Sequence, residues 1–416
     1  MVGIKNVLHS KRYDGDYLKI SRLPNGLTVI TEKFPSAVSV ATEIGVRYGG
    51  MDTSGKIAGS AHFLEHMLFK GTKKRTWKEI TNEIERKGGH SNAYTSYEHT
   101  AYWNIIPKEY FIDAIDVLAD MYQNSIFDKK EFEKERTTVI SELLQRKDIP
   151  RYVIYEFFPK TLYTKNPIKN PSIGNEKTLK NISKNTITGQ WKDNYTAKNT
   201  IITVVGNIEH KKILRVIKEK FNSLRPGIER KREEYKEYKT SRFTIKRKNL
   251  NQMHLAIGFR ICNGNHKDVY AIDILESILH ERIKDEIREK RGLSYAPSVS
   301  TQFGQTFGFL CGYANIKHKD FEKTRALILD EFKKAYKGKI TKKEFEERKM
   351  FIKNSYLIEN ETTEEAADTI TTFAMLGDPT LFKEYPKRIE SVKFEDVKKV
   401  AKKYLKPGTQ GELIVR

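Results

Sequence analysis

The chain has 416 residues, of which 38% are hydrophobic and 31% charged, and it contains two cysteines. This composition excludes an intrinsically disordered chain, and so few cysteines exclude a disulfide-stabilised scaffold. The 76 basic and 54 acidic residues give a net charge of +22. However, the two signs are mixed along the chain, as on an ion-paired surface, and no nucleic-acid-binding motif accompanies them. We therefore expect no nucleic-acid partner.

Membrane and secretion signals are missing from the sequence as well. No run of about 18 or more apolar residues occurs, which excludes a membrane-spanning helix. The N-terminal stretch MVGIKNVLHSKRYDGDYLKI lacks the apolar core of about 7–15 residues that a secretory signal requires. We therefore expect a cytoplasmic protein.

Strand and helix patterns mix along the first half of the chain. Alternating or continuous apolar patterns predict strands at 27–34, 38–49, 92–107 and 201–208. Apolar residues at helical spacing predict helices around 62–66 and over 76–88, 111–124 and 129–147. This mixture predicts an α+β fold in which an antiparallel sheet carries helices mainly on one face.

The second half of the chain repeats the pattern of the first. TEIGVRYGG (42–50) and AHFLEHMLF (61–69) match HLAIGFRIC (254–262) and AIDILESIL (271–279) in order and spacing. KKEFEKERTTVISELL (129–144) likewise resembles KKEFEERKMFIKNSYL (342–357). We interpret this as a duplicated domain, so both halves are expected to share one α+β architecture.

A segment rich in charge separates the two halves. Pro226 and Gly227 precede a dense run of charged residues, which is typical of a domain boundary. We expect a first domain over residues 1–225, a linker over 226–238 and a second domain over 239–416.

The first half contains the pattern H-x-x-E-H, formed by His62, Glu65 and His66. On a helix the two histidines lie one turn apart on one face, with Cβ atoms about 5–6 Å apart, so they can share one Zn²⁺. Glu65 lies beside both and can accept a proton from water without binding the metal. The alternative is that the two histidines are partly buried structural residues.

A third metal ligand is expected from the helix over 129–147. Catalytic zinc takes three protein ligands and keeps one position open. Glu142 lies in the apolar run VISELL, where a carboxylate needs a partner such as a metal. Glu135 lies two helical turns earlier on the same face, where it can hold the helix and tune the site. The alternative for Glu135 is an ordinary solvated acid.

The duplication gives an internal comparison for this candidate site. Both histidines and both helix acids are replaced together in the second half, although the surrounding apolar pattern is kept. This joint loss indicates one functional unit that is present in the first half only. The aligned pairs are His62 with Asp273, Glu65 with Glu276, His66 with Ser277, Glu135 with Arg348, and Glu142 with Ser355.

The stretch GSAHFLEHMLFKGT (59–72) resembles the M16 zinc metallopeptidases, a family that includes pitrilysin, insulinase and the mitochondrial processing peptidase. The inverted motif H-x-x-E-H marks the inverzincins. The resemblance continues through GGHSNAYTSYEHT (88–100) and REKRGLSY (288–295) and covers most of the chain. Glu142 stands where the family has its third zinc ligand, and Glu135 matches a further catalytically important glutamate of the family.

The resemblance implies the α+β fold of the LuxS/MPP-like metallohydrolases and a zinc-dependent endopeptidase that cleaves unfolded peptides, with Glu65 as general base. Chains of this length resemble the short subfamily, in which two subunits enclose a chamber. Asn92 and Ala93 would lie on the edge strand that binds peptide by β-addition. Arg288 and Tyr295 match a pair that reaches the substrate from the opposing half, and in a homodimer it would come from the partner subunit.

One departure from the family leaves alternatives open. Relatives often carry a glycine-rich segment where this chain runs directly through 279–282, and in heterodimeric relatives that segment belongs to the non-catalytic subunit. The chain could therefore be the active subunit of a heterodimer. A non-catalytic structural or regulatory subunit of the same fold is a second alternative, although such copies usually lose the zinc residues.

Overall fold

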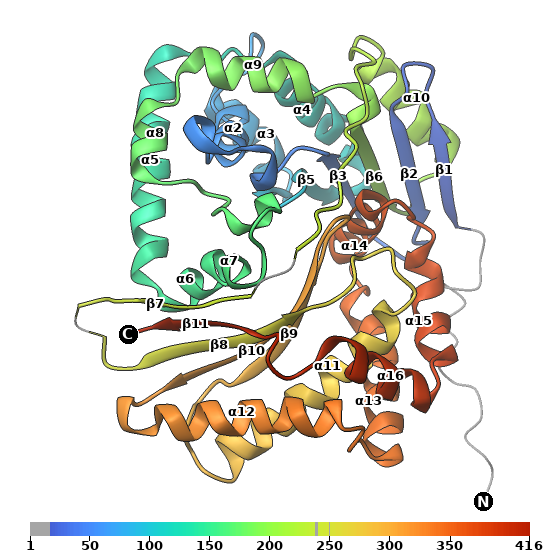
Figure 1. Ribbon diagram of the computed structural model, residues 1–416. Coiled ribbons are helices and arrows are strands. Elements are labelled where there is room, and N and C mark those ends of the chain that lie inside the picture. The colour runs from blue at the N-terminus through green and yellow to red at the C-terminus, as the bar shows by residue number, and fades with distance from the viewer. Residues whose placement is uncertain (1–16, 238–239, 249) are drawn as a thin grey trace, which may run out of the picture.

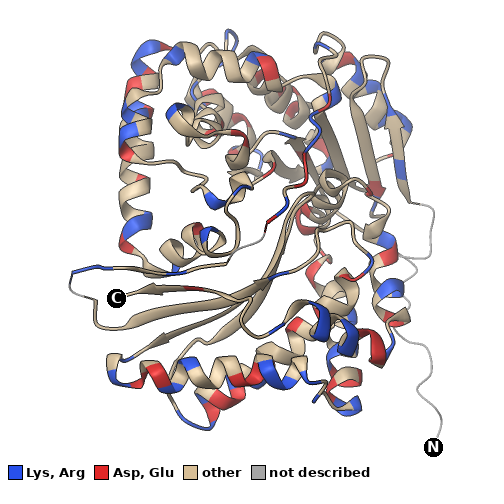
Figure 2. Ribbon diagram, in the orientation of Figure 1, with Lys and Arg blue, Asp and Glu red and all other residues tan. Residues whose placement is uncertain are grey.

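Two β-sheets, one in each half of the chain, organise the structure (Figure 1). The computed structural model describes residues 17–237, 240–248 and 250–416. Each sheet carries the helices of its own half mainly on one face, which confirms the predicted α+β fold with two similar halves. Lysine and arginine alternate with aspartate and glutamate over both halves (Figure 2), as expected for an ion-paired surface.

The first sheet has six strands in the order β1-β2-β6-β3-β5-β4. Neighbouring strands are antiparallel, except that β2 and β6 run parallel. The segment predicted as strand at 92–107 forms a hairpin, because the Ser96 amide bonds the His99 carbonyl and closes a turn. The strands are β1 (Leu18–Arg22), β2 (Thr28–Lys33), β3 (Ser39–Val46), β4 (His90–Thr95), β5 (Thr100–Pro107) and β6 (Thr200–Gly206).

The second sheet repeats this topology without a counterpart of β1. Its order is β7-β11-β8-β10-β9, and its one parallel pair, β7 with β11, stands where β2 and β6 stand in the first sheet. The duplication inferred from the sequence is therefore visible in the strand order. The strands are β7 (Arg242–Ile245), β8 (Met253–Arg260), β9 (Ser298–Phe303), β10 (Gly308–Ile316) and β11 (Gly411–Val415).

The helices follow the same repeat. In the first half they are α2 (Ser60–Leu68), α3 (Trp77–Glu85), α4 (Phe111–Asn124), α5 (Lys129–Asp148), α6 (Pro150–Phe157), α7 (Pro159–Leu162), α8 (Glu176–Asn181), α9 (Lys184–Asn194) and α10 (His210–Phe221). In the second half they are α11 (Val269–Lys284), α12 (Phe321–Tyr336), α13 (Lys342–Glu359), α14 (Thr363–Leu376), α15 (Leu381–Ser391) and α16 (Phe394–Tyr404). The predicted helices of the first half are all present. Helix α11 runs without interruption through 279–282 and continues as a π-helical turn, Asp285–Glu289.

The second face of each sheet is covered by a helix from the other half. Helix α14 packs on β3 and β6 of the first sheet, and α6 packs on β8 and β11 of the second. Val205 and Ile370 belong to one buried apolar cluster at these contacts, and Ala256 and Ile154 belong to another. Helix α6 follows α5, and α14 follows α13, so the two helices occupy equivalent positions in the repeat. Each half thus gives one helix to the sheet of the other half, and we call this the helix exchange. The halves therefore cannot separate without exposing an apolar sheet face to water.

Within the described part of the chain, no helix combines the length and the apolar character needed to cross a bilayer.

This exchange predicts that α14 stabilises the whole chain. We expect Ile370→Ala, at a fully buried position, to cost about 2–5 kcal/mol of unfolding free energy, because the cavity lies between the halves. The control is Ile358→Ala on α13, whose side chain is 70% exposed. Thermal and urea denaturation measure both variants, and equal stabilities would contradict the proposed coupling of the halves.

Candidate metal centre

Helix α2 positions the motif His62, Glu65 and His66. The helix begins after Gly59, whose φ of +89° and close approach to the Ile173 carbonyl leave no room for a side chain. Nearly every residue of α2 is buried, so its orientation is fixed by packing. The two imidazole rings lie on one face, with centroids 4.7 Å apart, as the spacing predicts.

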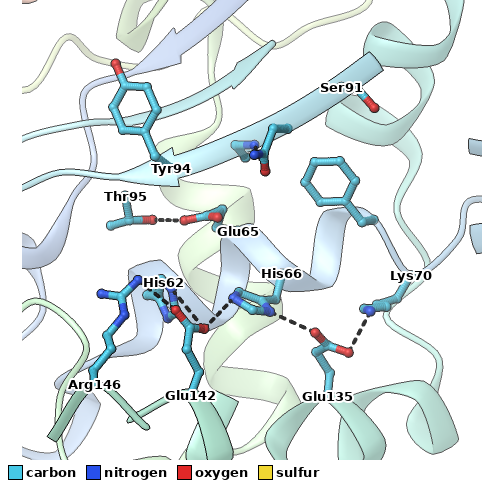
Figure 3. Close-up of a pocket in the computed structure, with 13 residues that line it drawn as sticks. His62, Glu65, His66, Lys70, Ser91, Tyr94, Thr95, Glu135, Glu142 and Arg146 are labelled. Carbon is cyan, nitrogen blue, oxygen red and sulfur yellow. Dashed lines mark hydrogen bonds and ion pairs between the residues drawn. The ribbon is translucent and has the colours of Figure 1, made fainter. Parts of the chain in front are cut away.

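Helix α5 packs against α2 and supplies the third candidate ligand. The Glu142 Oε2 atom lies 3.3 Å from His66 Nε2 and 3.6 Å from His62 Nε2. Among the described residues, these three form the one group whose ligand atoms, all within 4.8 Å of one another, could hold a metal ion. Figure 3 shows the three side chains converging between the helices. The structure therefore brings together the residues that the sequence selected.

The donor set fits zinc. Two imidazole nitrogens and one carboxylate oxygen are a usual catalytic zinc set, and they leave a fourth position free. That side opens into a pocket of about 450 Å³. A metal would also compensate the burial of these ionisable groups, since His62 is 6% exposed.

The electrostatics of the ligands favour a bound cation. Burial and the neighbouring His66 lower the pKa of His62 to about 3, so its imidazole is neutral, the form that binds metal. Burial lowers the pKa of His66, but hydrogen bonds with Glu135 and Glu142 outweigh it and raise the pKa to about 9. For the carboxyl group of Glu142, burial raises the pKa. The neighbouring His66, His62 and Arg146 outweigh this effect and lower the pKa to about 2. The carboxylate is therefore ionised and ready to accept a cation.

Glu135 contacts the site through His66. Its Oε1 lies 2.8 Å from His66 Nδ1, and its Oε2 lies 2.6 Å from the Lys70 ammonium. The Glu135 side chain is 4% exposed. A carboxylate on Nδ1 fixes the imidazole ring so that Nε2 faces Glu142. Glu135 is therefore placed where it can orient a candidate ligand, and its role stays a prediction.

Glu65 lines the same pocket without joining the three-ligand group. It is 8% exposed, and its Oε2 accepts a hydrogen bond of 2.5 Å from the Thr95 hydroxyl. Burial raises the pKa of Glu65. The side chain is therefore held in place beside the ligands, where a carboxyl group can act as a general acid or base.

Three residues at the site were not predicted from the sequence. Lys70 binds Glu135, Thr95 binds Glu65, and the Arg146 guanidinium lies 2.7 Å from Glu142 Oε1. A signal existed for two of them, because Lys70 follows His66 and Arg146 follows Glu142 by four residues, one helical turn. Thr95 depends on how β4 lies against α2, which local spacing does not encode.

Strand β4 forms one wall of the pocket. Ser91, Asn92 and Ala93 line it. In the sheet β4 pairs only with β5, so it is an edge strand among the described residues. It also packs against α2, the helix that carries the two histidines.

Arg288 and Tyr295 are not among the residues that line this pocket. The Arg288 guanidinium lies 5.1 Å from the Tyr295 ring centre, and Tyr295 is 80% exposed. Within one chain, therefore, the structure does not bring this pair to the metal ligands.

The equivalent place in the second half holds no metal group. Helices α11 and α13 pack together as α2 and α5 do, but Asp273 receives a hydrogen bond from Tyr385, and Arg348 lies 3.5 Å from Glu281. Burial and Asp273 raise the pKa of Glu276 to about 8. The second half therefore keeps the packed pair of helices but has other residues at the positions of the metal ligands.

The chain is similar in sequence to known proteins. Residues 28–176 match the family model described as insulinase (peptidase family M16), and residues 181–351 match the peptidase M16 inactive domain. An uncharacterized zinc protease of Rickettsia felis is 31% identical over 405 residues, which is 95% of this chain and 97% of the relative. The uncharacterized zinc protease YmxG of Bacillus subtilis is 30% identical over 343 residues, 82% of this chain and 83% of the relative.

Solved structures show the same fold. A protease from Helicobacter pylori has a TM-score of 0.89, with 24% identity, over 96% of this chain and 99% of its own. A peptidase M16 inactive domain from Pseudomonas fluorescens has a TM-score of 0.88, with 17% identity, over 96% of this chain and 97% of its own.

The contact between Glu135 and His66 predicts a graded effect on metal affinity. We expect Glu135→Ala to weaken zinc binding about 10- to 100-fold, because His66 loses the group that orients it. Competition with a fluorescent chelator measures the affinity. Glu131→Ala, one turn earlier on α5, is the matched control, and equal affinities in both variants would contradict the assigned role.

Proposed function

Because the chain belongs to the M16 family of peptidases, we propose that it is a zinc-dependent endopeptidase that hydrolyses unfolded peptides. The observation that carries the proposal is the convergence of His62, His66 and Glu142 beside Glu65 in one pocket. The complete set argues against a non-catalytic subunit. The relatives named as zinc proteases support the choice of metal.

In the proposed site, His62 and His66 hold Zn²⁺ together with Glu142. The bound ion would polarise the scissile carbonyl and lower the pKa of water. Glu135 keeps the His66 ring oriented, and Lys70 keeps Glu135 ionised and in place.

Glu65 is the proposed general base. Its carboxylate takes the proton of the attacking water and passes it to the leaving amine, so that the peptide bond breaks without a covalent enzyme intermediate. The Thr95 hydroxyl holds one carboxylate oxygen and leaves the other available for proton transfer.

The substrate would bind as an added strand along β4, contacting Asn92 and Ala93. An edge strand offers unpaired backbone groups that an extended peptide can satisfy, and an unfolded peptide is free to adopt that extended form. A neighbouring pocket of about 510 Å³ shares Thr95 and Arg146 with the metal site and is lined by Tyr152. It offers room for a substrate side chain next to the scissile bond.

We also propose a homodimer in which Arg288 and Tyr295 of one subunit complete the site of the other. Their exposure and their absence from the pocket of their own chain support this assignment. An active subunit paired with a second M16 chain is the alternative. The cytoplasmic location stays a prediction.

The domain division stays a proposal too, with a first domain over 1–225, a linker over 226–238 and a second domain over 239–416. The strands of the two sheets fall within 18–206 and 242–415, which supports it. The boundary at 238–239 lies outside the described residues.

The proposed base gives the first test. We expect the wild-type protein to cleave an unstructured, internally quenched peptide and Glu65→Gln to lose at least about 100-fold in kcat, since general-base catalysis contributes about that much. Glu65→Gln should still bind zinc, as measured by metal analysis. Activity that persists in Glu65→Gln, or in chelator-treated protein, would contradict the proposal.

The dimer gives the second test. Glu65→Gln and the double variant Arg288→Ala/Tyr295→Phe should each be inactive alone. Mixed and re-equilibrated in equal amounts, they should recover about one quarter of the wild-type activity, because half of the dimers are mixed and one of their two sites is intact. Mixing Glu65→Gln with His62→Ala, which damage the same site, is the control. No recovery in the first mixture would contradict completion of the site across subunits.

A further inference from the structure

An acidic pocket lies on the other side of β4 from the metal ligands. Its volume is about 500 Å³. Strands β3, β4 and β5 form one wall, and α14 with the end of α13 forms the other. Among the described residues that line it, none is a lysine or arginine, although the chain carries a net charge of +22. The acids that line it are Glu43, Glu359, Glu364, Glu365 and Asp368.

Glu43 is the buried carboxylate of this pocket. It lies on β3, is 2% exposed, and its Oε1 has no hydrogen-bond partner in the described part of the chain. Burial and the nearby Asp368 raise the pKa of Glu43 well above its usual range. A buried carboxyl oxygen without a partner is costly, and a cation or donor entering the pocket would satisfy it.

The acids of α14 face the strand along which we propose that peptide binds. Glu364 and Asp368 lie one helical turn apart. The Tyr94 hydroxyl donates a 2.6 Å hydrogen bond to Asp368 Oδ1, and His90 Nε2 lies 3.5 Å from Glu364. His90 and Tyr94 are four residues apart on β4, so they share one face of the strand. Figure 3 shows Tyr94 pointing away from the metal ligands, while Thr95 points toward Glu65.

We propose that this pocket binds the cationic side chain of a lysine or arginine in the peptide substrate. The inference rests on the proposed function, because it requires a peptide added to β4. Side chains of such a peptide alternate between the two faces of the sheet. Every second side chain therefore points to the metal side, and those between point to the side of α14.

The pocket suits an organic cation better than a metal ion. In the described ranges the one group of three or more residues with metal-ligand spacing is that of His62, His66 and Glu142, so no three acids of this pocket lie close enough to hold an ion together. The rings of Tyr94 and Trp103 also line the pocket. Aromatic faces beside carboxylates bind the long, partly apolar side chains of lysine and arginine through cation–π contacts and charged hydrogen bonds.

The experiment compares peptides that differ at one position. An internally quenched peptide without charged side chains receives a single lysine at each position in turn, with norleucine at the same position as the neutral reference. We expect lysine to raise kcat/KM about 10-fold at one or more of the alternate positions whose side chains point toward α14. A gain of this size corresponds to one charged hydrogen bond. At the intervening positions the ratio should stay near one.

Substitutions in the pocket test whether its acidic residues cause the preference for lysine. Glu364→Gln/Asp368→Asn should reduce the lysine-to-norleucine ratio at the favoured position about 10-fold, since two carboxylates are neutralised. Glu346→Gln/Glu347→Gln, which neutralises two exposed acids of α13 outside the pocket, is the control for net charge and should keep the wild-type ratio. Glu43→Gln gives a second variant if the double variant does not fold.

A binding measurement separates the two proposals. The Glu65→Gln protein is titrated with the same fluorescent peptides, and anisotropy gives the affinity without cleavage. Cleavage without a lysine preference, or a preference that survives both variants, would overturn the inference and leave the peptidase intact. Lysine-dependent binding that the α14 variants abolish, in a wild-type protein that cleaves nothing, would overturn the peptidase and support the pocket. Equal binding of all peptides without cleavage would overturn both.

Discussion

The packing of α5 on α2 is the constraint on which the candidate site depends. Phe63 of α2 stacks on Phe132 of α5 with ring centres 4.8 Å apart, and the Arg136 guanidinium covers both rings. This contact fixes the rotation of α5, so that Glu142, 10 residues beyond Phe132, faces the two histidines. Without it, the ligands would be three separate ionisable groups, each of which is costly to bury. The metal pocket is therefore a product of apolar packing between the two helices.

Helical periodicity explains why so much of this site could be predicted. The spacings within H-x-x-E-H and between Glu135 and Glu142 place side chains on helix faces, and the structure has them there. The repeat in the sequence likewise indicated that both halves share one architecture, whereas the order of the strands came from the structure alone. What periodicity cannot give is contact between elements that are distant in the chain. The hydrogen bond from Thr95 to Glu65 depends on the placement of β4 over α2, and the covering of the first sheet by α14 leaves no local pattern.

The exchange of α6 and α14 gives the second half a structural role, although this half lacks the metal-binding residues. At the place equivalent to the metal site, Tyr385 donates a hydrogen bond to Asp273. Helix α14 of this half covers the face of the first sheet that lies opposite to the metal ligands. Thr371 of α14 bonds Thr203 of β6, and Ser39 of β3 bonds Thr363. The second half is thus part of the wall against which β4 is held. A duplicated domain that lost its chemistry can be retained for this reason alone.

The same exchange places the acidic residues of α14 beside β4, although the chain as a whole has a positive net charge. A chain with 22 excess positive charges should repel a basic peptide at long range, but screening at physiological salt limits that repulsion to roughly 8 Å. At contact distance the peptide meets α14, whose first turn carries Glu364 and Glu365. Acids at a helix N-terminus are stabilised by the helix dipole, and Glu364 also lies 3.5 Å from His90 Nε2 of β4. The carboxylates that stabilise this helix terminus thereby remain available to a cation that arrives along β4, and recognition is decided by the few groups beside that strand.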